Sequence, residues 1–144
     1  MKSNIAIVAV LIAGAVGYVM WPTAPQTAST DSAISMEDRV LANVLLPETL
    51  SQNAKIGKIG FEAKCAACHG INAAGQDGVA PPLVHIIYEP GHHGDEAFQR
   101  AAAVGVRAHH WWFGDMPPVE GVTRADVTMI VAYIRELQRA NGIN

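Results

Sequence analysis

The sequence of 144 residues contains only two cysteines, few aromatic residues and few charged ones. Phe, Trp and Tyr make up 6% of the chain, so a core built from side chains alone would be small. With no second cysteine pair, the chain does not supply the ligands of a usual structural zinc site. The net charge of −3, with both signs mixed along the chain, argues against a nucleic-acid-binding protein.

The chain shows neither an internal repeat nor the apolar–polar alternation of strands, so we predict an all-α fold. A first short helix is expected after Ser35, where Ser35–Asp38 resembles a capping box. An apolar stripe supports this helix, and Pro47 would end it; the stripe comprises Val40, Leu41, Val44 and Leu45.

Three further helices are predicted. One begins near Ser51 and runs to about residue 69. A second covers residues 96–104, with Asp95 as its cap. The last begins at a better-placed capping box, Thr123–Asp126, and ends at Asn141–Gly142.

An uncharged apolar run from Ile5 to Trp21 follows Lys2. Its length suits either a signal peptide or a membrane anchor, and we favour an uncleaved anchor because no suitable cleavage site follows the run. Residues 22–35 are rich in Pro, Thr, Ala and Ser and are typical of a linker. The predicted organisation is therefore an anchor at 1–21, a linker at 22–35 and one domain at 36–144. Lys2 would remain cytoplasmic, which places the domain in the periplasm.

Cys65, Cys68 and His69 form a Cys-Ala-Ala-Cys-His motif. On a helix these three side chains share one face, so two thiols can bond to the vinyl groups of one porphyrin while the imidazole binds its iron. A redox dithiol would instead need a βαβ setting, and no strand pattern is present. The motif predicts one covalently bound haem c.

The iron then has a sixth position, for which Met116 and several histidines are candidates. Met116 lies between an aspartate and two prolines, which is not the context of a methionine that fills a helical core. We therefore predict Met116 as the sixth ligand, and its thioether would stabilise Fe(II).

The segment from about residue 51 to residue 140 resembles the class I c-type cytochromes. The resemblance rests on the haem motif and on residues around it, namely Gly57, Phe61, Pro81, Leu83, Met116, Pro117 and Tyr133. It implies that Gly57, Phe61 and Tyr133 form the crossing of the first and last helices. It also implies that the Pro81 carbonyl accepts a hydrogen bond from His69.

The stretch from Tyr88 to Trp112 departs from this family pattern and is rich in histidine and tryptophan. Such a stretch can bind copper or zinc, but no pair of histidines four residues apart occurs in it. The sequence therefore favours local roles at the haem. In this interpretation Trp111 or Trp112 lines the haem edge. Hydrogen bonds to the haem propionates come from Arg107, His109 and a Trp N–H.

Together these features predict an electron carrier, not an enzyme, that serves redox partner proteins at the membrane. Two alternatives remain open from sequence. One is a haem enzyme or gas sensor with an open sixth position, and the other is a cytochrome subunit fixed in an oxidase or dehydrogenase complex.

Overall fold

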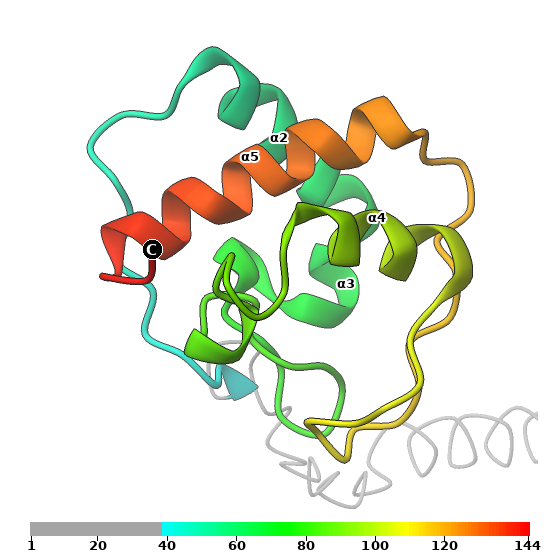
Figure 1. Cartoon of the computed structure of the whole chain (residues 1–144). Coiled ribbons are helices and arrows are strands. Elements are labelled where there is room, and N and C mark those ends of the chain that lie inside the picture. Colours follow the sequence, from blue (N-terminus) through cyan, green and yellow to red (C-terminus); the bar gives the residue numbers. More distant parts are fainter. Residues whose placement is uncertain (1–38) are drawn as a thin grey trace, which may run out of the picture. The chain divides into compact units, whose positions relative to one another are not determined.

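The computed structural model describes residues 39–144, and these form helices joined by loops (Figure 1). The elements are α2 (Gln52–Lys64), α3 (Ala66–His69), η2 (Ile71–Ala73), η3 (Ile86–Tyr88), α4 (Asp95–Val104) and α5 (Arg124–Ala140). Within residues 39–144 there is no strand, only two isolated β-bridges. The all-α prediction is confirmed for this part of the chain.

Helix α2 begins where its sequence predicts. The Ser51 hydroxyl accepts a hydrogen bond from the Ala54 N–H at 3.2 Å, which satisfies one of the free amides of the first turn. The helix buries Ala54, Gly57 and Phe61, which follow one another at helical spacing. This face is turned toward α5.

Helix α5 begins at the predicted capping box, in which Thr123 and Asp126 bond each other's side chains and backbone amides. It packs against α2 and α4 and crosses in front of α2 in Figure 1. One face is buried and supplies much of the core: Val127, Ile130, Val131, Tyr133, Ile134 and Leu137.

Helices α2 and α5 meet at Gly57. A Cβ atom added there would lie 1.8 Å from the carbonyl oxygen of Met129, so only glycine allows this close approach. One turn further on, the rings of Phe61 and Tyr133 pack with centroids 5.7 Å apart. The residues that the resemblance assigns to the helix crossing thus lie together.

The predicted first helix is wrong where the structure describes it, because residues 40–50 contain no helix. Their backbone groups bond to distant parts of the chain instead. The amides of Leu41 and Ala42 donate to the Ala74 carbonyl, and the Asn141 side chain bonds both the N–H and the C=O of Leu45. These tertiary bonds replace the i→i−4 bonds that a helix would form.

Helix α4 begins at Asp95 itself, with Gly94 at the capping position, so Asp95 is not the predicted cap. Its carboxylate accepts a hydrogen bond from Arg135 Nε at 2.9 Å. The acidic side chain still lies in the first turn, where it is favourable for the helix dipole.

The predicted anchor (1–21), the linker (22–35) and the first residues of the domain lie outside the described residues. Among residues 39–144, no helix combines the length and apolar character needed to cross a membrane.

Candidate functional site

The haem motif forms a single helical turn directly after α2. Cys65 ends α2 and precedes α3, and its carbonyl accepts from the amides of Cys68 and His69 at 3.1 and 2.9 Å. Cys65 and Cys68 are not joined by a disulfide bond. Cys65, Cys68 and His69 all line one cavity of about 640 Å³, as expected for neighbours on a helix face.

His69 is buried and held by one hydrogen bond. Its Nδ1 donates to the Pro81 carbonyl at 2.9 Å, which leaves the lone pair on Nε2. Burial lowers the pKa of His69, and the bond to Pro81 partly opposes that shift. The result is a neutral, oriented imidazole of the kind that binds iron.

Burial, together with the neighbouring Cys68, raises the pKa of Cys65 to about 11. Cysteines that act as nucleophiles need a lowered pKa, because the thiolate is the reactive form. The environment of Cys65 therefore argues against a thiol-dependent enzyme.

Gln76 binds the backbone of the haem motif, and this role was not predicted from the sequence. Only 6% exposed, its Nε2 lies 3.3, 2.9 and 3.2 Å from the carbonyl oxygens of Ala66, Ala67 and Cys68. The Ala66 carbonyl also accepts from the Gly70 amide at 2.9 Å, and the short helix leaves the next two carbonyls to Gln76. A glutamine in a loop rich in glycine and alanine carries no sequence pattern that would identify this role.

Met116 reaches the same cavity from the segment that follows α4. Val106 and Met116 exchange two backbone hydrogen bonds, both 2.9 Å long. Gly105 has a φ of +79°, and a Cβ there would lie 2.4 Å from the Met116 carbonyl oxygen. Figure 1 shows this yellow segment running down from α4 and turning back toward α5. The Met116 side chain is half-buried, and the hydrogen bonds to Val106 hold its backbone in place.

The other predicted pocket residues divide into two groups. Leu83, Arg107, His109 and Trp111 line the cavity, whereas Trp112 is 90% exposed and does not. Of the two tryptophans considered for the haem edge, Trp111 is therefore the one that lies at the cavity. Phe113, which was not predicted, lines the cavity and stacks on Trp111 at 5.8 Å. The run of three aromatic residues at positions 111–113 could have indicated that Phe113 also lies at the pocket.

These residues fit a covalently bound haem. The cavity has the size of a ligand site and a largely apolar lining that includes Phe98, Ile130 and Ile134. Two thiols and one neutral imidazole lie at one of its walls. The Trp111 Nε1–H lies near Tyr88 but has no partner at hydrogen-bond geometry among residues 39–144, so a donor is available for an acidic group such as a propionate.

In a comparison with known protein families, residues 54–138 match the family model described as cytochrome c. The family binds haem c covalently through a Cys-x-x-Cys-His motif, which here is formed by Cys65, Cys68 and His69. The chain has no match among curated proteins or solved structures.

Proposed function

Because the chain belongs to the cytochrome c family, we propose that it shuttles single electrons between redox proteins on the periplasmic face of a membrane. The matched residues cover more than half of the sequence and include the whole haem motif. The family assignment makes the chain a haem-based electron carrier, and the covalent haem c supplies the one-electron iron couple.

The chain would bind one haem, through its only two cysteines. His69 would provide the proximal nitrogen, with its tautomer and ring orientation held by the Pro81 carbonyl. Gln76 would hold the turn that carries both attachment sites. Leu83 and the apolar residues of α5 would exclude water, which limits reactions other than electron transfer.

The observation that carries this proposal is that His69 and Met116 line the same cavity from different segments of the chain. The bonds between Val106 and Met116 hold the backbone of Met116 beside this cavity. A thioether opposite an imidazole raises the reduction potential relative to two imidazoles and leaves no open position for substrates. This geometry favours electron transfer over a haem enzyme or gas sensor.

The location at a membrane rests on the sequence before residue 39. The apolar run from Ile5 to Trp21 supports an anchor, and the segment 22–35 supports a tether to the haem domain. Lys2 supports an orientation with the domain outside the cytoplasm. A tethered domain could serve a free partner or form one subunit of a larger redox complex.

The sixth ligand is tested by the Met116→Ala variant, with Met129→Leu as the control. The Met116 variant should retain covalent haem, because attachment depends on Cys65 and Cys68. Its ferric spectrum should lose the weak near-infrared band of a bound thioether, and its reduction potential should fall. The ferrous form should bind carbon monoxide. Met129→Leu, on α5, should leave all of these properties unchanged.

A Met116→Ala protein with the wild-type spectrum and potential would show that the thioether is not on the iron. A histidine would then be the sixth ligand. If the wild-type ferrous protein itself binds carbon monoxide readily, the sixth position is open and the electron-carrier proposal fails in favour of a haem enzyme or gas sensor.

A further inference from the structure

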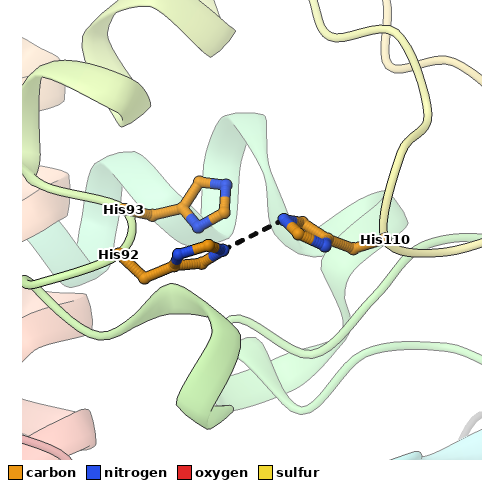
Figure 2. A group of neighbouring side chains, drawn as sticks. All are labelled: His92, His93 and His110. Carbon is orange, nitrogen blue, oxygen red and sulfur yellow. Dashed lines mark hydrogen bonds between the residues drawn. The ribbon is translucent and has the colours of Figure 1, made fainter.

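Three histidines from two separate segments come together beside the haem cavity. His92 and His93 lie in the turn before α4, and His110 lies in the segment after it. One ring nitrogen from each lies within 4.8 Å of the other two. Figure 2 shows the three rings converging from opposite sides. From the sequence, copper or zinc binding was considered for this stretch but local roles were favoured, because His92 and His110 are 18 residues apart and no histidine pair has helical spacing.

The distance between the ring nitrogens of His92 and His110 matches metal coordination. The Nε2 atoms of His92 and His110 are 3.3 Å apart (Figure 2). Two nitrogens bound tetrahedrally to zinc at 2.0–2.1 Å lie about 3.3 Å apart, so the observed separation needs no rearrangement. A hydrogen bond between the two imidazoles would explain this one pair, but it leaves the third ring unexplained.

His93 is oriented as a metal ligand commonly is. Its Nδ1 donates to the Ile87 carbonyl at 2.7 Å, which leaves the lone pair on Nε2. Its own carbonyl accepts from Arg135 Nη2 at 2.6 Å, so its backbone is held to α5. The centroids of the three rings are 4.7, 5.2 and 5.2 Å apart, an almost equilateral arrangement that no single hydrogen bond requires.

We propose that His92, His93 and His110 bind one transition-metal ion, Zn(II) or Cu(II), in addition to the haem iron. Neutral imidazole is a preferred ligand for both ions, and three such ligands leave one position for water or a fourth group. His109 is the nearest further imidazole, with its ring 4.3 Å from that of His110. His93 and His110 also line the haem cavity, so the ion lies at the rim of that cavity.

The test uses the haem-loaded protein without a histidine tag, stripped of metal by a chelator. Equilibrium dialysis against Zn(II), and separately against Cu(II), should give one ion per chain by elemental analysis. Loss of an outer-shell partner weakens metal sites about 10–100-fold, so loss of two ligands in His92→Ala/His110→Ala should weaken binding by at least about tenfold. The Cu(II) form should show nitrogen hyperfine splitting in its paramagnetic resonance spectrum.

His85→Asn is the matched control. His85 is outside the cluster, and its Nδ1 accepts from the Ile87 amide, a role that the Asn oxygen can take over. This variant should bind metal as the wild type does. The single variant His110→Gln provides a second test should the double variant fold poorly, which the haem spectrum would reveal.

Failure of the wild-type protein to bind a stoichiometric ion would overturn the proposal, as would equal affinity in the wild-type and ligand-deficient variants. If the histidines bind the haem iron and not a second metal, the wild-type protein will fail to take up a stoichiometric ion, and the proposal is overturned. The result does not depend on electron transfer or on the identity of the sixth haem ligand, because metal content is measured directly.

Discussion

Arg135 Nη2 donates a hydrogen bond of 2.6 Å to the carbonyl oxygen of His93, and thereby joins α5 to the turn that carries two of the clustered histidines. The same guanidinium donates to Tyr88 O at 2.6 Å and to the Asp95 carboxylate at 2.9 Å. Its side chain is only 8% exposed, whereas that of Asp95 is 71% exposed. One buried cation therefore holds the chain between η3 and α4 to the last helix.

Replacing Arg135 with Met should destabilise the fold by about 3 kcal/mol, because several charge-assisted hydrogen bonds to a buried guanidinium are lost at once. The measurement is chemical denaturation of the haem-loaded protein. Arg139→Met is the control on the same helix, where the guanidinium is 4.0 Å from Glu136 and largely exposed. That change should cost less than about 0.5 kcal/mol. Equal effects of the two variants would contradict the role of Arg135.

Gly57→Ala should destabilise the protein by about 3 kcal/mol or more, because the new methyl would overlap the Met129 carbonyl and force α2 away from α5. Gly60→Ala, in the same helix, is the comparison. Its methyl would lie 3.2 Å from the Ile130 side chain, which can move. The helix propensity of alanine offsets that contact, so stability should change by less than about 1 kcal/mol. Thermal unfolding of both variants measures the difference.

Gln76→Glu should impair formation of the haem site, since a carboxylate cannot donate to the carbonyls of Ala66, Ala67 and Cys68. We expect a loss of about 2 kcal/mol in stability and a smaller fraction of chains with covalent haem. Gln99→Glu is the control. Gln99 is 8% exposed, and its Nε2 also donates to a backbone carbonyl, but this carbonyl belongs to Arg124 at the start of α5. The control variant should lower stability without reducing haem attachment when both proteins are produced at low temperature.

The capping box of α5 predicts a pH dependence. Hydrogen bonds from the side chain and the backbone N–H of Thr123 lower the pKa of Asp126. A carboxylate with a lowered pKa stabilises the folded state above its unfolded pKa of about 3.9, and this contribution is lost as the pH falls through the lower folded value. Asp126→Asn should therefore be less stable than wild type at pH 7.

Denaturation of both proteins from neutral to acidic pH checks this prediction. The difference in stability should be constant near neutrality and should shrink only below about pH 4, where the unfolded-state carboxylate becomes protonated. A difference that persisted unchanged in strong acid would mean that the charge of Asp126 is not its cause.

Features that depend on neighbouring residues were predictable from the sequence. The attachment motif, the Ser51 cap and the Thr123–Asp126 capping box are each completed within a few residues, so local geometry decides them. The glycine at position 57 also indicated a helix crossing, because an interior glycine is unfavourable without a close neighbour.

Features that depend on distant partners were decided only by the tertiary structure. Residues 40–50 have a helical apolar pattern, yet their amides bond to Ala74 and Asn141, and these contacts replace the helix. The roles of Gln76 and Arg135 arise because the fold brings backbone carbonyls from other segments within reach of their side chains. The histidine cluster also depends on the fold. Helix α4 separates His92 and His93 from His110 in the sequence, and the folded chain brings the three rings together. Hydrogen bonds and metal ligation act over about 2–3 Å, so only the folded chain determines which distant groups come within reach.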